Sequence, residues 1–206
     1  MNKKLILTTS LLISACTQNI QINPNDIIPC NQKDDIQKYC DAKTNKLLNG
    51  YTHDINDLTE LELKDTYTYY RNGIKTEMKT FYDNGNIAIQ KFFTINPKTK
   101  TEEVNSTSYF KNGNKSSNFD GKKYIQYYIN GNIYAEIEAD TNITTDKLYD
   151  PTGKLMFISK WNQQTKDKTF YTPTNELYNG TITYYKIQKP DMIMKQEKIV
   201  NGKLKK

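Results

Sequence analysis

The chain has 206 residues, enough for one domain with a sizeable core, and a formal net charge of +6. Nearly all of its basic residues are Lys, and Arg71 is the only Arg. Nucleic acid is therefore a poor partner, because proteins that read it favour the bidentate fork of Arg. His53 is the only His and is expected on a strand surface, and every Gly belongs to a turn-like dipeptide. We expect no catalytic triad, no phosphate loop, no metal site and no cofactor, and hence no enzyme.

The first 15 residues have the layout of an export signal. Residues 1–4 are basic, and residues 5–15 form an apolar run. A membrane-spanning helix needs about 20 residues, so this run has the length of a signal-peptide core and not that of an anchor helix. Residues 1–15 are predicted to be a signal peptide.

The run ends in Ile13-Ser14-Ala15-Cys16, which resembles the bacterial lipobox. The resemblance implies that Cys16 becomes the N-terminus and carries diacylglycerol and a further acyl chain such as palmitate, which anchors the protein in a membrane of the cell envelope. In lipoproteins an Asp after the Cys favours the inner membrane. Position 17 is Thr, which favours the outer membrane. An ordinary signal peptide with a chance Cys is the alternative.

Residues 16–41 form a segment distinct from the main domain. Residues 17–29 lack helical or strand periodicity and are expected to form a flexible tether. Cys30 and Cys40 are the other two Cys residues, and in an oxidising compartment such a pair predicts a disulfide. Free thiols and a metal or redox pair are the alternatives. The sequence also allows a short helix near residues 34–39.

Asparagine–glycine dipeptides are the main internal signal. Asn-Gly favours the left-handed conformations of a type I′ hairpin turn, and segments rich in Tyr, Thr, Ile and Phe flank these dipeptides, as expected of strands. Residues 133–140 alternate most cleanly between apolar and polar. The predicted repeat turns are Asn49-Gly50, Asn72-Gly73, Asn84-Gly85, Asn112-Gly113, Asn130-Gly131, Asn179-Gly180 and Asn201-Gly202.

Two longer patterns recur. An aromatic residue stands three positions before four of these glycines, as in Tyr82-Asp83-Asn84-Gly85, and the segment at residues 44–50 reappears at residues 174–180. Over residues 42–206 the set resembles the bacterial variant of the MORN repeat, whose members are often labelled antitoxin-like. The resemblance implies an all-β domain: an elongated, open antiparallel sheet of repeated hairpins laid side by side.

The turn signals lapse near residues 93–108, 140–148 and 160–170, where we expect long loops. Asn105 and Asn142 lie in two of these stretches, each within an acidic-x-Asn-x-Ser/Thr pattern. This pattern resembles the acceptor of periplasmic oligosaccharyltransferases, which makes both residues candidate glycosylation sites. Chance matches in a chain rich in Asn and Thr are the alternative.

Two surface patterns each allow a structural and a functional interpretation. Glu136, Glu138 and Asp140 share one predicted strand face, either as Ca²⁺ ligands or, as we favour, as a solvated face paired with Lys of neighbouring strands. The 16 Tyr residues either stabilise a thin sheet by cross-strand packing, which we favour, or form a binding strip for peptide or glycan.

These features together predict an envelope-anchored lipoprotein that acts as a non-enzymatic protein–protein interaction or scaffold module. Exposed strand edges and sheet faces favour another envelope protein as its partner. A periplasmic immunity or antitoxin-like protein is one alternative. A glycan or cell-wall binder that uses a Tyr-rich sheet face is another.

Lipidation is testable by intact-mass spectrometry of the chain extracted from its native membrane. The wild-type chain is expected to carry a lipid mass increment that Cys16→Ala abolishes, because the thioether to diacylglycerol needs the Cys sulfur. An unlipidated wild-type chain cleaved at another position would contradict the anchor.

Overall fold

The computed structural model of the protein describes residues 20–30, 36–58 and 62–205. Apart from the 3₁₀ helix η1 (Pro24–Asp26), the regular elements of these residues are strands. No helix among them is long and apolar enough to cross a membrane. The strands are β1 (Gln21–Ile22), β2 (Ile27–Pro29), β3 (Tyr39–Asp41), β4 (Gly50–Leu58), β5 (Leu63–Arg71), β6 (Ile74–Tyr82), β7 (Ile87–Ile95), β8 (Glu102–Tyr109), β9 (Lys115–Phe119), β10 (Lys123–Tyr127), β11 (Ile133–Ala139), β12 (Ile143–Tyr149), β13 (Leu155–Asn162), β14 (Lys168–Tyr171), β15 (Gly180–Lys186), β16 (Lys189–Val200) and β17 (Lys203–Leu204).

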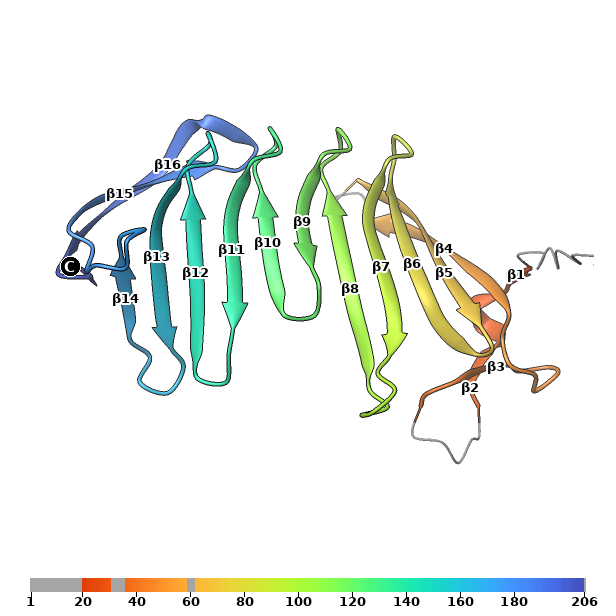
Figure 1. The fold of residues 1–206 in the computed structure, drawn as a ribbon. Coiled ribbons are helices and arrows are strands. Elements are labelled where there is room, and N and C mark those ends of the chain that lie inside the picture. The colour runs from red at the N-terminus through yellow and green to blue at the C-terminus, as the bar shows by residue number, and fades with distance from the viewer. Residues whose placement is uncertain (1–19, 31–35, 59–61, 206) are drawn as a thin grey trace, which may run out of the picture.

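One long, open sheet dominates the molecule (Figure 1). It has 12 strands, in the order β1 and then β4 to β14. From β4 to β14 every strand pairs antiparallel with the next strand along the chain, whereas β1 lies parallel to β4. The predicted all-β fold, an elongated open sheet of consecutive hairpins, is confirmed.

The turns along one edge of this sheet are joined to one another by side chains. Asn86 follows the turn glycine Gly85, and its Nδ2 donates a hydrogen bond of 2.9 Å to the carbonyl oxygen of Lys111 in the next turn of the same edge. The equivalent bonds join Asn114 to Ile129 and Asn132 to Pro151, at 2.8 and 2.7 Å. The Asn that follows the Gly in the repeated motif therefore sets the position of one hairpin on the next.

The Asn-Gly turns fall into two groups. Both residues have positive φ, as a type I′ turn requires, at Asn72-Gly73 and Asn201-Gly202. At Gly85, Gly113 and Gly131 only the Gly has positive φ, and its N–H bonds to the carbonyl oxygen of the aromatic residue three positions earlier. These three turns are therefore type I turns followed by a left-handed Gly.

The prediction of a hairpin turn is wrong at Asn49-Gly50 and Asn179-Gly180. Each Gly is instead the first residue of a strand, β4 or β15. The φ angles of the two glycines are positive, at 150° and 149°. Both dipeptides end the longer segment that occurs twice in the sequence, and they mark places where the chain leaves one sheet and begins another.

The long loops predicted near residues 93–108, 140–148 and 160–170 are also wrong. These stretches consist of strand ends joined by short turns at the opposite edge of the sheet. The strands β7 and β8, for example, pair without interruption up to Ile95 and Glu102. These turns lack Asn-Gly, so the pattern of that dipeptide does not predict them.

A different local motif closes several of these turns. The side chain of Asn96 accepts the backbone N–H of Lys98 at 2.9 Å, and Lys100 takes a left-handed conformation with φ of 60°. Short Asn and Asp side chains favour such turns because they bond to backbone N–H groups nearby. The same five-residue turn occurs at residues 41–45 and 162–166.

Residues 20–29 belong to the folded structure and not to a free tether. Here β1 pairs with β4, and β2 pairs with β3. Both pairings involve strands that precede the hairpin repeat, so the repeat pattern does not predict them. Cys30 and Cys40 form a disulfide, with Cα atoms 5.2 Å apart, across the β2–β3 hairpin.

Some expected features lie outside the described residues. They include the signal peptide, the lipidation residue Cys16 and the tether up to residue 19. Of the short helix expected near residues 34–39, residues 36–38 form no helix, and Tyr39 belongs to β3.

The repeated segment adopts the same conformation at residues 44–50 and 174–180. In the first copy the Asn49 side chain accepts the backbone N–H of Asn72 at 2.9 Å, and in the second the Asn179 side chain accepts that of Asn201 at 2.7 Å. Each copy therefore docks on the Asn-Gly turn two strands further along the chain. By this correspondence β15, β16 and β17 are a second copy of β4, β5 and β6.

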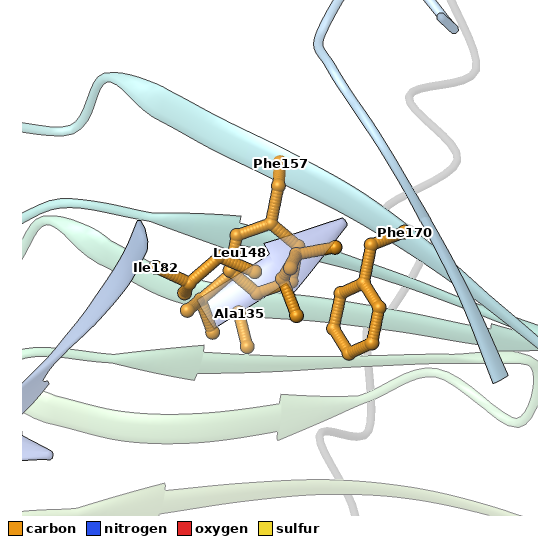
Figure 2. Close-up of a cluster of buried hydrophobic side chains, with 6 residues drawn as sticks. Ala135, Leu148, Phe157, Phe170 and Ile182 are labelled. Atoms are coloured by element: carbon orange, nitrogen blue, oxygen red, sulfur yellow. The ribbon is translucent and has the colours of Figure 1, made fainter. Parts of the chain in front are cut away.

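The second copy folds back over the long sheet. The strands β15, β16 and β17 form a separate three-stranded sheet, drawn in blue in Figure 1, that covers one face of the long sheet at its C-terminal end. Ile182 and Ile199 of this sheet are 2% and 1% exposed. They pack in one cluster with Ala135, Leu148, Phe157 and Phe170 of the long sheet (Figure 2). Burial of such side chains contributes about 1.5–3 kcal/mol each, so this cluster is the principal core.

The turns at Gly73 and Gly202, on which the two copies of the repeated segment dock, leave no room for a larger residue. A Cβ added at Gly73 would lie 2.8 Å from Leu47 Cδ2 and from the Tyr39 carbonyl oxygen, and one at Gly202 is equally crowded, whereas at Gly113 it meets open space. All three glycines have positive φ. Gly113→Ala is expected to cost about 1 kcal/mol from backbone strain alone, and Gly73→Ala and Gly202→Ala about 2–3 kcal/mol, in urea unfolding. Equal losses at all three positions would contradict the docking.

Candidate functional site

A groove lies between β13 and β15 at the C-terminal end of the long sheet. It has a volume of about 470 Å³. We call it the β13–β15 groove. Its walls are formed chiefly by Leu155, Met156, Phe157, Tyr178, Thr181 and Tyr185.

Both walls of this groove include strand edges without a strand partner. The strand β14 has four residues and pairs only with residues 158–161 of β13, so residues 155–157 have no partner on that side among the described strands. The strand β15 pairs with β16 on one side and with no described strand on the other. Unpaired edges present backbone N–H and C=O groups to an incoming chain.

The junction between the two sheets explains why the groove exists. After β14 the chain turns at once, and the N–H of Thr172 bonds to the carbonyl oxygen of Glu176 at 2.7 Å. The ring of Tyr178 then packs on that of Phe157, with centroids 6.4 Å apart. Gly180 starts β15 in a new direction. The chain therefore leaves β13 before it has paired with residues 155–157, and this part of the strand edge has no strand partner among the described residues.

The groove combines an apolar floor with opposite charges at one end. Phe157 and Ile182 are buried beneath it, and Asp150 and Lys154 lie at the β12–β13 turn. Burial alone would raise the pKa of Asp150, but hydrogen bonds from the Thr152 hydroxyl and from backbone N–H groups outweigh it and lower the pKa. Asp150 is therefore ionised at neutral pH. This combination suits an extended peptide with an apolar side chain and a nearby basic one.

A second unpaired edge lies on β8. The strand β9 pairs with β8 only from Ser106 onward, so residues 102–105 border a notch of about 460 Å³ that the β9–β10 turn partly closes. Three carboxylates line it, from Glu102, Glu103 and Asp120. Phe119 and Val104 supply its apolar side chains.

The candidate glycosylation residues occupy different environments. Asn105 is exposed at this notch, but it lies within β8 and not in a loop. Asn142 is exposed in the β11–β12 turn, where its Oδ1 accepts a hydrogen bond of 2.9 Å from Gln164 Nε2. The expected loop position is therefore wrong for Asn105.

The three carboxylates of the β11 pattern are not gathered around one point. The carboxylate of Glu136 lies 2.9 Å from Lys123 Nζ, in line with the expected pairing with Lys of neighbouring strands. Asp140 follows the end of β11. No group of three or more His, Cys, Asp or Glu is placed to hold a metal ion within the described parts of the chain.

Aromatic rings form a cross-strand strip on β4, β5 and β6. The ring of Tyr51 lies 5.8 Å from that of Tyr69, and the ring of Tyr67 lies 5.7 Å from that of Phe81. His53 stacks on Tyr67 at 4.5 Å, and its Nε2 lies 2.8 Å from a carboxylate oxygen of Asp65. Each of these side chains is half-buried. Packing of aromatic rings across neighbouring strands stabilises a thin sheet.

The groove residues were not predicted as a site. Residues 155–157 show only strand character in the sequence, and nothing local indicates that β14 is short. Tyr178 and Gly180 do lie in the repeated segment at residues 174–180. That repeat is the one sequence signal that marks the groove, because it ends one sheet and starts the next.

The fold and the groove define an open, all-β hairpin sheet with unpaired strand edges. No family model, no curated protein and no solved structure matches this chain.

From the hydrogen bond between Tyr149 and Glu136 we expect the protein to lose stability at high pH. Burial first, and then the Glu136 carboxylate that accepts the tyrosine hydroxyl at 3.1 Å, raise the pKa of Tyr149 from 10.0 to about 12. Because the folded chain holds this proton more tightly, the stabilisation is complete below pH 10 and is lost as the pH approaches 12. When the free energy of unfolding in urea is measured as the pH is raised from 10 to about 12, it should fall less for Tyr149→Phe and for Glu136→Gln than for the wild type. An unchanged loss in both variants would contradict the pairing.

Proposed function

We propose that the mature chain is a lipoprotein of the cell envelope, anchored at Cys16, whose MORN-like hairpin sheet is a non-enzymatic protein-interaction module. Its partner is an extended segment of another protein, bound in the β13–β15 groove. One observation carries this proposal: two unpaired strand edges border a single groove with an apolar floor.

Strand addition is the binding mode that the groove favours. An extended segment that enters it finds backbone partners on residues 155–157 or along β15. Main-chain hydrogen bonds of this kind give affinity, and pockets for alternate side chains give specificity. Because side chains of a strand point alternately to opposite sides, one set of the partner's side chains would contact Phe157 and Tyr178, and the other set would face solvent.

Charge gives the bound segment a direction. Asp150 and Lys154 lie together at the β12–β13 turn, and Asp150 is held in its ionised form by its hydrogen bonds. A basic side chain of the partner is favoured beside Asp150, and an acidic one beside the exposed Lys154.

The alternatives separate by the surface they use. If the chain is an immunity or antitoxin-like protein, it would use the same β13–β15 groove, and the bound protein would be a toxin. A glycan binder would instead use the aromatic strip, whose central residue is Tyr67.

Site-specific cross-linking tests the groove. A photo-reactive amino acid at Thr181, which lines the groove, is expected to capture one envelope protein in living cells. The matched control is Thr165, which is exposed in the β13–β14 turn and should capture none. With that protein purified, Thr181→Lys should weaken binding about tenfold or more because a charge on an edge strand blocks strand addition, whereas Thr165→Lys should not.

Two results would contradict this site. Equal adduct yields from positions 181 and 165 would show that capture is not specific to the groove. Binding that survives Thr181→Lys but is lost in Tyr67→Ala would move the site to the aromatic strip.

A further inference from the structure

The strand β16 carries an apolar rib that neither sheet covers. Met192, Ile193 and Met194 are consecutive and are 40%, 54% and 52% exposed. Side chains of consecutive strand residues point to opposite sides. The rib is therefore apolar on both of its faces, unlike the rest of β16, where Ile199 is buried in the core.

The pairing between β15 and β16 is irregular beside the rib. The register shifts twice, between Tyr184 and Tyr185 and between Tyr185 and Lys186. As a result Tyr185 pairs with Ile193 and Lys186 pairs with Lys189. Residues 190–192 and 194 of β16 therefore have no partner on β15.

Lysine side chains flank the rib on both sides along the chain. Residues 186–198 contain four Lys and two acidic residues, a net charge of +2. Lys186, Lys189 and Lys198 are exposed and take part in no ion pair with any described residue. Lys195 is the exception and pairs with Glu197 at 2.9 Å.

We propose that the rib and its lysines dock on an anionic membrane surface. Lys side chains near such a surface are attracted to its acidic headgroups, and apolar side chains beside them enter the boundary between headgroups and acyl chains. A groove on a protein would cover one face of the strand and leave the other apolar face in water. A fluid lipid boundary can surround both faces, so the two-sided exposure favours lipid.

Docking at this point would also orient the molecule. The strand β1 lies at one end of the long sheet, and β14 with the covering β15–β16 hairpin lies at the other (Figure 1). With a lipid on Cys16 as well, the membrane would hold the sheet at both ends and its long axis would lie along the bilayer. This orientation, unlike the docking itself, rests on the proposed anchor.

Vesicle partitioning tests the docking without the anchor. The mature form, residues 16–206 with Cys16→Ser, keeps all contacts among the described residues. It is expected to bind vesicles of phosphatidylcholine with phosphatidylglycerol and to partition about tenfold or more less onto phosphatidylcholine alone. Replacement of Met192, Ile193 and Met194 by Ser should reduce binding to the anionic vesicles about tenfold, and so should Lys→Gln at positions 186, 189 and 198.

A matched control has the same change in charge elsewhere. Lys98, Lys100 and Lys115 are exposed and far along the chain from the rib, and their replacement by Gln should leave binding nearly unchanged. Unfolding curves of all variants should coincide with that of the parent form, because every replaced side chain is exposed. Equal binding to neutral vesicles, or equal losses in the control, would overturn the proposal. Full competition by soluble poly-glutamate in the presence of an intact rib would also overturn it and would assign the surface to an acidic protein.

Discussion

Hydrogen bonds from one turn to the next hold the hairpins of the long sheet together along one edge. Besides the Asn side chains, the hydroxyl of Tyr82 donates to the carbonyl oxygen of Tyr109 at 2.7 Å, and that of Tyr128 donates to the carbonyl oxygen of Tyr149 at 2.9 Å. A single hairpin is marginally stable in water, and this sheet has a packed core mainly at its C-terminal end. The aromatic residue and the Asn of each motif thus supply contacts that a second layer would otherwise provide.

The repeated segment at residues 44–50 and 174–180 interrupts this regular addition of strands. Its Asn side chain caps the turn of a later hairpin, and its Gly begins a strand in a new direction. At the C-terminal end the interruption has two results. It brings Ile182 and Ile199 over the long sheet as a core, and it leaves half of the β13 edge without a partner. The core and the groove are therefore products of the same junction.

The sequence predicts the fold class and one edge of the sheet well, because Asn-Gly turns with aromatic flanks are local signals. It fails at the other edge, where Asn96 forms the turn through its own side chain and Lys100 takes the left-handed conformation without Gly. It also fails for residues 20–29, whose pairing with β3 and β4 is non-local. The groove is not predictable from local pattern, since it depends on the length of β14 and on the direction of β15.

The hairpin of β15 and β16 serves three surfaces at once, and strand geometry keeps them separate. Its inward side chains, such as Ile182, enter the core. Its backbone edge, which has no strand partner among the described residues, borders the groove near Thr181. Its irregularly paired part, around Ile193, is exposed and has lysines on either side along the chain. Since side chains on the two faces of a strand and the groups on its edge point in different directions, stability and the proposed strand addition and membrane docking depend on different residues of one element. A change at one of these surfaces need not disturb the other two, provided that the junction at Gly180 and Gly202 keeps the hairpin in place.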